Sequence, residues 1–102
     1  MSVILNLGSA ANTATISAVD TLTSGAGADT IAVTGPVTNA SFDLGAGNDI
    51  LTLGTGPNSA SVANVETLTG GTGNDTITLA GALTTAMSVD LGTGSDKLTL
   101  AN

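Results

Sequence analysis

A short glycine-rich segment that ends in aspartate occurs four times in this chain of 102 residues. The fullest copy, Gly-Gly-Thr-Gly-Asn-Asp, occupies residues 70–75, and the others occupy residues 24–29, 44–49 and 91–96. Each copy is followed by large apolar residues that alternate with Thr or Ala, as in Thr-Ile-Thr-Leu at 76–79. Side chains that alternate with period two indicate a β-strand. The repeated unit is therefore a loop followed by a short strand.

The chain also repeats itself at longer range. Residues 19–35 match residues 65–81 after a shift of 46, and residues 41–53 match residues 88–100 after a shift of 47. Such self-similarity is the sequence signature of a solenoid, in which each coil packs on its neighbours.

We therefore expect one all-β domain spanning residues 1–102. It consists of two tandem repeats, about 1–48 and 49–102, each with two coils. The loop aspartates are 20, 26 and 21 residues apart, which leaves room for two short strands and two turns per coil.

One apolar pattern departs from alternation. Ile16, Val19 and Leu22 are three residues apart, as are their counterparts at 62, 65 and 68. We interpret this spacing as a bend or bulge that lengthens alternate coils.

Composition excludes several classes of function. Eight acidic residues against the single base Lys97 give a formal net charge of −7, so nucleic acid is an improbable partner. The chain has no Cys and no His, and it also lacks Tyr and Arg, which argues against an enzyme.

No apolar run approaches the ~18 residues of a membrane span, and no cleavable N-terminal signal follows Met1. If the protein is exported, we expect another route.

Each loop combines flexible backbone with a carboxylate. Two glycines let main-chain carbonyls turn inward together, and the aspartate two residues later adds a hard oxygen ligand. Calcium takes six to eight such oxygens in a forgiving geometry. The candidate metal ligands are Gly25, Gly27, Asp29, Gly45, Gly47, Asp49, Gly71, Gly73, Asp75, Gly92, Gly94 and Asp96.

Stacking strengthens the case for a cation. Neighbouring strands lie about 4.8 Å apart, and two unit charges at that distance repel by roughly 3 kcal/mol at an effective dielectric constant near 20. Aligned carboxylates would therefore oppose folding unless calcium lay between them. Asp20, Asp43, Glu66 and Asp90 are interpreted as a solvated face, although any of them can complete a nearby coordination sphere.

The loops resemble the nonapeptide G-G-x-G-x-D-x-U-x of the RTX (repeats-in-toxin) family. Gly70, Gly71, Gly73, Asp75 and Ile77 match in full, whereas the other copies carry Ser or Leu in place of the first glycine. The resemblance implies a right-handed parallel β-helix or β-roll solenoid, with calcium bridging the loops of adjacent coils. Because the turns at 34–39 and 54–59 lack Asp, we expect the calcium-binding turns to stack on one flank, with about three interior sites.

The leading functional hypothesis is a calcium-dependent extracellular structural protein at a bacterial cell surface, exported without a cleaved N-terminal signal. Lys97–Leu100 lie in the phase of Ile4–Leu7, so copies can stack head to tail into filaments.

Two alternatives stay open. The first is an excised calcium-binding module of a larger secreted adhesin, surface-layer protein or toxin. A third reading is an RTX-type ice-binding module, which uses outward Thr and Asn of stacked loops. Only the loop at 70–75 carries both residues, because Ala26, Ala46 and Ala28 interrupt the array in the first half.

Overall fold

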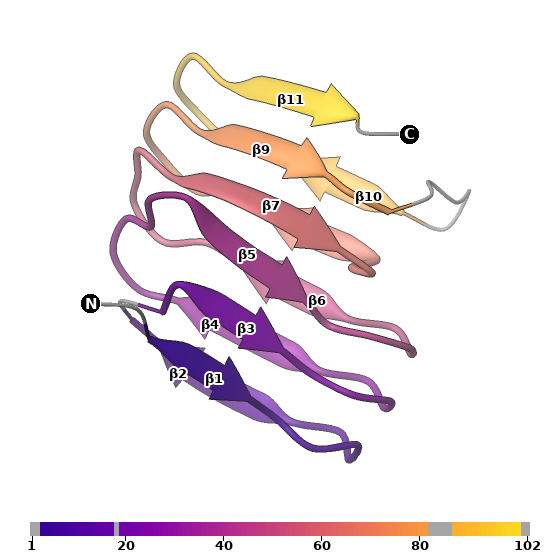
Figure 1. The fold of residues 1–102 in the computed structure, drawn as a ribbon. Coiled ribbons are helices and arrows are strands. Elements are labelled where there is room, and N and C mark those ends of the chain that lie inside the picture. Colours follow the sequence, from indigo (N-terminus) through magenta and orange to yellow (C-terminus); the bar gives the residue numbers. More distant parts are fainter. Residues whose placement is uncertain (1–2, 18, 82–86, 101–102) are drawn as a thin grey trace.

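Short strands wind into a flattened parallel β-solenoid of about five turns (Figure 1). The computed structural model describes residues 3–17, 19–81 and 87–100, and these contain eleven strands and no helix. No helix in these ranges is long and apolar enough to cross a membrane.

Consecutive strands alternate between two facing parallel sheets. Sheet A contains β1 (Ile4–Asn6), β3 (Thr21–Thr23), β5 (Ala40–Asp43), β7 (Ser59–Ala63), β9 (Thr76–Leu79) and β11 (Lys97–Leu100). Sheet B contains β2 (Thr13–Ile16), β4 (Thr30–Val33), β6 (Ile50–Thr52), β8 (Thr67–Thr69) and β10 (Ser88–Asp90). Each strand pairs with the strand one coil earlier or later in its own sheet.

The core is the narrow space between the two sheets. Alternation directs one set of side chains inward, so that Leu22, Phe42 and Val62 of sheet A face Ile31 and Leu51 of sheet B, and all five are almost fully buried. Aliphatic residues suit this space because a thin, regular layer leaves little room for large aromatic rings. The core therefore contains a single Phe.

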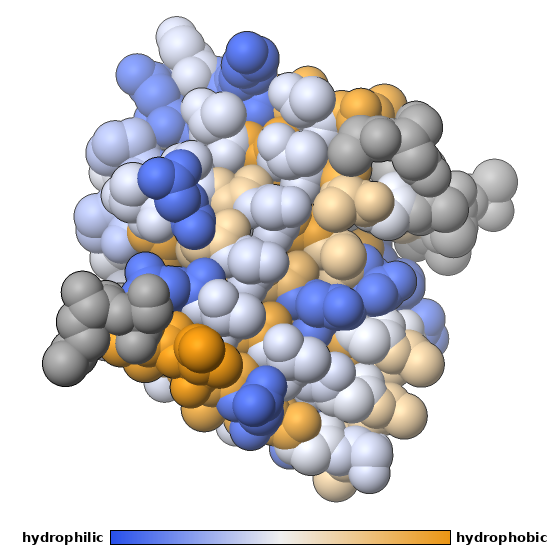
Figure 2. Space-filling model, in the orientation of Figure 1, coloured by the Kyte–Doolittle hydropathy of each residue, from blue (hydrophilic) through white to orange (hydrophobic). Residues whose placement is uncertain are grey.

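The outward positions carry Ser and Thr instead. In sheet A, the strand register aligns Thr21, Ser41, Ser61, Thr78 and Thr99 in one column. Figure 2 shows this face as a band of weakly polar atoms. A neutral polar surface of this kind suits solvent-exposed strands.

Coils differ in length because their corners differ. Hydrogen-bonded equivalents are separated by 17 residues between Asn12 and Asp29, by 20 between Asp29 and Asp49, and by 21 between Asp75 and Asp96. The short coils turn through tight corners that bury Val19 and Val65. The interpretation of this three-residue spacing as a bulge that lengthens coils was therefore wrong, since these corners shorten them.

The predicted parallel solenoid is confirmed, but the predicted placement of all four aspartate loops on one flank is wrong. Loops 24–29 and 44–49 lead from sheet A to sheet B, whereas loops 70–75 and 91–96 lead from sheet B to sheet A. Two loops therefore lie on each flank (Figure 1).

The physical reason is the length of the sequence repeat. A shift of 46 residues carries β1 onto β6 and β3 onto β8, which belong to the opposite sheet. One repeat thus spans two and a half coils, where two had been expected. The half coil turns the second copy of each loop to the other side.

Candidate metal centre

The glycine-rich loops form two stacks of three. The first stack contains loops 7–12, 24–29 and 44–49, at the corner from sheet A to sheet B. Its counterpart on the opposite flank, the second stack, contains loops 53–58, 70–75 and 91–96. The sequence repeat relates them loop by loop. In both stacks the first loop ends in Asn and the next two end in Asp, so the order of polar groups is the same.

Side chains at the ends of the loops form a ladder to the main chain. In the first stack, the main-chain N–H of Asn12 donates to Asp29 Oδ1 at 2.9 Å, and that of Asp29 donates to Asp49 Oδ1 at 2.8 Å. The N–H of Asp49 then donates to Glu66 Oε2 at 2.8 Å. Each carboxylate thus accepts from the equivalent residue one coil earlier, which fixes the vertical alignment of the column.

The second stack repeats this ladder. The main-chain N–H of Val37 donates to Asn58 Oδ1 at 3.0 Å, and that of Asn58 donates to Asp75 Oδ1 at 3.0 Å. The main-chain N–H of Asp75 donates in turn to Asp96 Oδ1 at 2.8 Å. Because β7, β9 and β11 begin immediately after Asn58, Asp75 and Asp96, these side chains also set where the strands start.

Glycine is required where the loops touch. Gly47 has φ +113° and Gly94 has φ +110°, a region that side chains disfavour. A Cβ on Gly47 would collide with the carbonyl oxygen of Gly27, and one on Gly94 with that of Gly73. The glycine carbonyls therefore face the next loop of the stack. Positive φ also occurs at the predicted ligands Gly27, Gly45, Gly71, Gly73 and Gly92.

Three of the four loop aspartates are completely buried. Asp29, Asp49 and Asp75 have 0% exposure, and Asp96 is half-buried. Asp49 Oδ2 and Asp75 Oδ2 have no hydrogen-bond partner among the described residues. A buried polar atom without a partner costs about 1–3 kcal/mol, and more when the group is charged. These two oxygens are the atoms of this region that most need a cation.

The pKa values of Asp29 and Asp49 move in opposite directions. Burial raises the pKa of Asp29, but hydrogen bonds from the Ser24 hydroxyl and from Asn12 outweigh burial and leave it below 3.8. For Asp49, burial raises the pKa to about 6, and the neighbouring charges of Asp29 and Glu66 act in the same direction, although the N–H of Asp29 opposes them. The charged form of Asp49 is therefore destabilised in the folded protein.

Main-chain oxygens lie close to the open carboxylate of the second stack. A Cβ built on Gly70 would lie 2.8 Å from the carbonyl oxygen of Leu91 and 3.0 Å from Asp75 Oδ2. A Cβ built on Gly56 would lie 2.6 Å from Asp75 Oδ1 and 3.1 Å from the carbonyl oxygen of Thr72. Each point thus has two oxygens close to it, beside Leu91 Cα at 2.9 Å in the first case and the main-chain nitrogen of Asn58 at 2.8 Å in the second. Oxygen ligands of this kind are the ones that calcium takes.

Carboxylates alone do not make a metal centre. Within the described part of the chain, no group of three acidic side chains is placed to hold one ion. A bound cation would need the loop carbonyls as well. The structure therefore brings together the residue types predicted from the sequence, as pairs of aspartates on each flank rather than as one column of four.

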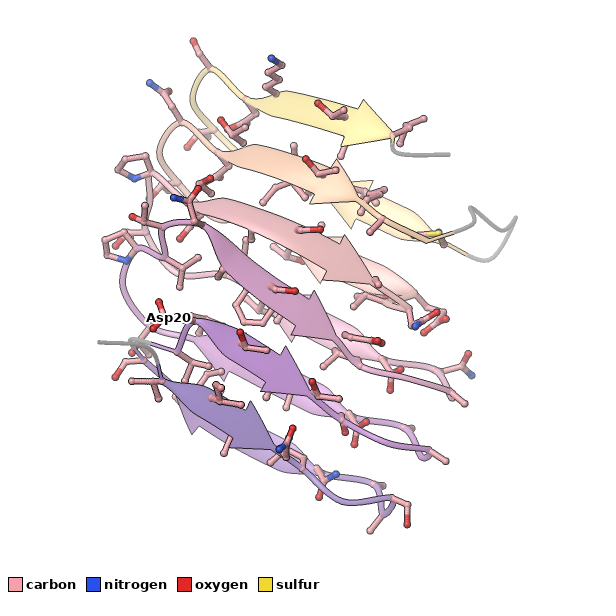
Figure 3. All side chains as sticks on the ribbon, in the orientation of Figure 1. Asp20 is labelled. Carbon is pink, nitrogen blue, oxygen red and sulfur yellow. The ribbon has the colours of Figure 1, made fainter. Side chains whose placement is uncertain are left out.

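Sequence reasoning missed Asn12, Asn58 and Glu66 as members of these columns. Glu66 had been interpreted as part of a solvated face, yet its carboxylate accepts a hydrogen bond from the main-chain N–H of Asp49. The available signal was positional, because Asn12, Asn58 and Glu66 immediately precede strands, as the loop aspartates do. Asp20 follows the same rule, since it accepts the N–H of Val3 at 2.8 Å (Figure 3).

Asp43 and Asp90 play a different part. Asp43 Oδ1 accepts the N–H of Gly45 at 3.1 Å, and Asp90 Oδ1 accepts that of Gly92 at 2.9 Å. Both side chains are exposed and cap the entrance to a loop. They serve as turn residues and lie outside the two ladders.

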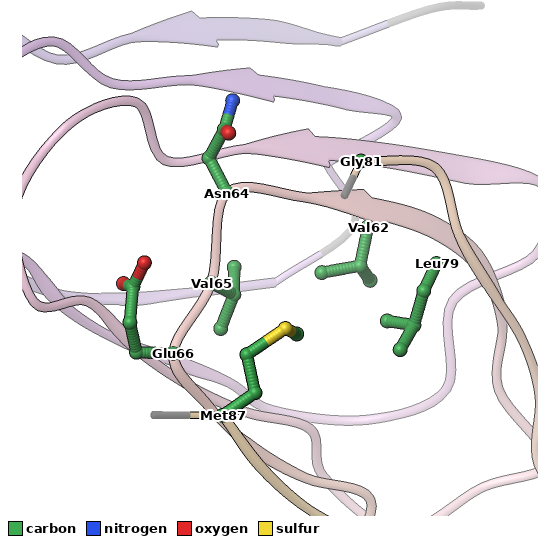
Figure 4. A pocket seen from close by; sticks show the side chains of 7 residues that line it. All are labelled: Val62, Asn64, Val65, Glu66, Leu79, Gly81 and Met87. Atoms are coloured by element: carbon green, nitrogen blue, oxygen red, sulfur yellow. The ribbon is translucent and has the colours of Figure 1, made fainter. Parts of the chain in front are cut away.

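A small hollow of about 80 Å³ lies beside β7 and β9 (Figure 4). Val62, Val65, Leu79 and Met87 gather around it, and Glu66 lies at its margin. The lining is mainly apolar, and its described residues offer no constellation of catalytic groups.

Comparison with protein families matches the RTX calcium-binding nonapeptide repeat over residues 17–32, 41–60 and 63–81. These segments are just over half of the chain and include the loops at 24–29, 44–49 and 70–75. The chain belongs to this family.

As an RTX protein, the chain is a calcium-binding β-roll repeat module, of a type that is typically non-catalytic. RTX repeats bind calcium structurally and are typical of secreted bacterial proteins. Comparison with curated proteins and with solved structures finds no significant match. Membership of the family therefore identifies calcium as the metal, and the geometry of this chain indicates which residues can bind it.

In calcium-free buffer, the free energy of unfolding should fall as the pH rises from about 4 to about 6. Asp49 has a folded pKa of about 6 against 3.8 in the unfolded chain, so the folded state holds the extra proton in this interval and loses it as the pH rises. Each pKa unit corresponds to about 1.4 kcal/mol, so the loss is about 3 kcal/mol. Urea titrations at several pH values measure it.

The Asp49→Asn variant is the matched control, because its side chain does not titrate. Its stability should change much less over the same interval. A wild-type stability that rises between pH 4 and 6, or an equal fall in the variant, would contradict the role assigned to Asp49.

Proposed function

We propose that this protein is a calcium-dependent extracellular structural protein that stacks head to tail into filaments or a surface layer. The observation that carries the calcium dependence is the pair of buried, unpartnered oxygens, Asp49 Oδ2 and Asp75 Oδ2. Both belong to fully buried carboxylates in glycine-rich loops. A divalent cation supplies the positive charge that such a position lacks.

The proposed ligands come from adjacent loops of each stack. In the second stack, Asp75 and Asp96 supply carboxylates and the loop glycines supply carbonyls. In the first stack, Asp49 supplies a carboxylate, and Glu66 extends the column beyond the nonapeptide motif. The full proposed set is Gly25, Gly27, Asp29, Gly45, Gly47, Asp49, Gly71, Gly73, Asp75, Gly92, Gly94 and Asp96, together with Glu66.

Calcium binding is then linked to folding. The loop sites exist only when the coils are stacked, so an ion that binds the folded state stabilises it by mass action. A stabilisation of about 2.7 kcal/mol follows at a concentration one hundred times the dissociation constant. Extracellular calcium modules commonly bind in the 10⁻⁴–10⁻³ M range. Because RTX repeats are typical of secreted bacterial proteins, we place the protein outside the cell, at a bacterial surface.

Three features support head-to-tail stacking. Among the described strands, β1 pairs only with β3 and β11 only with β9, so each has an edge with unpaired main-chain groups. Both belong to sheet A, so β11 of one copy can continue into β1 of the next. The end layers are apolar, because Leu98 and Leu100, which are in register with the buried Ile77 and Leu79, are 43% and 51% exposed, and Leu5 lies over the core at the β1 end. Figure 2 shows an apolar area at the β1 end.

The alternative to filaments is that further coils of a longer adhesin, surface-layer protein or toxin cover these ends. Stacked copies and continuing chain make the same contacts, so the assembly state distinguishes them. Ice binding has less support, because the loop threonines Thr72 and Thr93 lie on the second stack while Ala26 and Ala46 occupy the same positions on the first. On the second stack, Thr55, Thr72 and Thr93 are exposed at equivalent loop positions, but only Thr72 is followed two residues later by Asn, so the array is short and incomplete.

Asp75→Asn should abolish one calcium site and also stabilise the calcium-free protein. Asn keeps the oxygen that accepts from Asn58 and replaces the unpartnered charged oxygen with a neutral amide. Removal of a buried, unpartnered charge is expected to add about 1–3 kcal/mol in calcium-free buffer. Isothermal titration calorimetry measures the number of bound ions, and thermal melts measure the stability.

Asp90→Asn is the matched control, since Asp90 is exposed and caps a loop of the same stack. Its calcium number should equal that of the wild type. Wild-type protein that binds no calcium at millimolar concentration would refute the proposed function. Equal calcium numbers in Asp75→Asn and wild type would remove Asp75 from the ligand set.

Leu98→Lys should prevent filaments without unfolding the protein. A charge in the apolar end layer would have to be desolvated at a junction between copies, whereas Lys can remain in solvent on an isolated copy. Electron microscopy of the calcium-loaded protein should show filaments for the wild type and none for the variant, while circular dichroism stays similar.

The control for this substitution is Ser41→Lys, which places the same charge on an exposed position of β5 in the middle of sheet A. That variant should assemble as the wild type does. A wild type that remains monomeric with saturating calcium would contradict head-to-tail stacking and favour a module of a longer chain.

A further inference from the structure

The second loops of the two stacks differ at their first residue. Ser24 opens the second loop of the first stack, and Gly70 occupies the same place in the second stack. Their backbones are held alike: the N–H of Ser24 donates to the carbonyl of Asp43 at 2.8 Å, and that of Gly70 to the carbonyl of Asp90 at 2.7 Å. The loops also differ at 26 and 72 and at 28 and 74, but the side chain at this first position is the one that contacts the loop aspartate.

In the first stack, Ser24 completes the hydrogen bonding of Asp29. The Ser24 hydroxyl donates to Asp29 Oδ2 at 2.6 Å, while the main-chain and side-chain nitrogens of Asn12 donate to Asp29 Oδ1 at 2.9 and 3.1 Å. Asp29 is fully buried and Ser24 is 7% exposed. Both oxygens of Asp29 thus have neutral donors inside the protein.

In the second stack, Asp75 has only half of this arrangement. The main-chain and side-chain nitrogens of Asn58 donate to Asp75 Oδ1 at 3.0 and 2.9 Å, matching Asn12. Asp75 Oδ2 has no donor, because Gly70 carries no side chain. The place of the missing Cβ is bounded by Leu91 O at 2.8 Å and Asp75 Oδ2 at 3.0 Å.

We propose that the Ser24 hydroxyl takes the place of a cation at Asp29. The first stack is thereby closed at Asp29 and stable there without metal, whereas the second stack is open at Asp75 and receives a divalent cation through Asp75 Oδ2 and the carbonyl of Leu91. The two copies of the repeat then bind calcium unequally. This inference rests on the proposed calcium binding and removes Asp29 from the ligand set given above.

The pKa of Asp29 agrees with this geometry. Burial raises the pKa of Asp29, but the hydrogen bonds from Ser24 and Asn12 leave this pKa below 3.8. The charged form of Asp29 is therefore stabilised without a metal. A Ser hydroxyl can also act as a calcium ligand through its oxygen. That alternative makes the opposite prediction for removal of the side chain, which lets one substitution distinguish the two roles.

Ser24→Gly is the decisive variant, because it gives the first stack the residue found in the second. We expect it to bind one more calcium ion per chain than the wild type by isothermal titration calorimetry. We also expect a lower melting temperature in calcium-free buffer, since Asp29 Oδ2 loses its donor. Ser24→Ala removes the hydroxyl but keeps the Cβ that fills the space, so it should lose stability without gaining an ion.

Gly70→Ser is the reciprocal change and should reduce the calcium number by one. Its Cβ would crowd Leu91 O at 2.8 Å, so the neighbouring loop must shift slightly. An unchanged or lower calcium number in Ser24→Gly would overturn the inference. If Ser24→Gly does not fold, an unchanged calcium number in Gly70→Ser would overturn it instead. Wild-type protein that binds no calcium would contradict the proposed function itself, which is a distinguishable result.

Discussion

The structure depends on a ladder in which a side-chain oxygen at the end of each loop accepts a main-chain N–H from the coil before it. This arrangement aligns the coils, but it also places carboxylates one above another, as at Asp29 and Asp49 or at Asp75 and Asp96. The protein limits the repulsion in two ways. Asn12 and Asn58 begin the columns with neutral amides that donate to the first aspartate. Main-chain N–H groups supply the remaining donors, and they leave Asp49 Oδ2 and Asp75 Oδ2 without any.

The length of the sequence repeat decides where these columns lie. Because 46 residues span two and a half coils, the same loop sequence occurs on both flanks and each column contains fewer acids than a single-flank arrangement would. Two short columns accumulate less like charge than one column of four. Divergence at one position, Ser24 against Gly70, then makes equivalent loops chemically different.

Much of this architecture could be predicted from the sequence. Alternating apolar residues such as Ile77 and Leu79 revealed strands, and the recurring glycine-rich segments with Asp75 as their clearest example revealed stacked loops and the RTX family. The flank could not be predicted, because it depends on how tightly the corners at Val19 and Val65 turn. Those corners shorten coils to 17 residues, and sequence periodicity does not report the length of a coil in space.

The details of the site were also beyond the sequence. Glu66 lies outside any glycine-rich loop, so its contact with the N–H of Asp49 follows only from the strand register. Likewise, Ser24 replaces the first glycine of the nonapeptide, and its importance emerges only from its 2.6 Å hydrogen bond to Asp29.

Thermal unfolding of the wild-type protein, followed by far-ultraviolet circular dichroism with chelator and then with millimolar calcium, tests the central claim most directly. The account predicts a strand spectrum and a cooperative transition with calcium, and a large loss of both when the ion is removed. Identical spectra and melting temperatures under the two conditions would contradict it, because the buried carboxylates would then be tolerated without a cation.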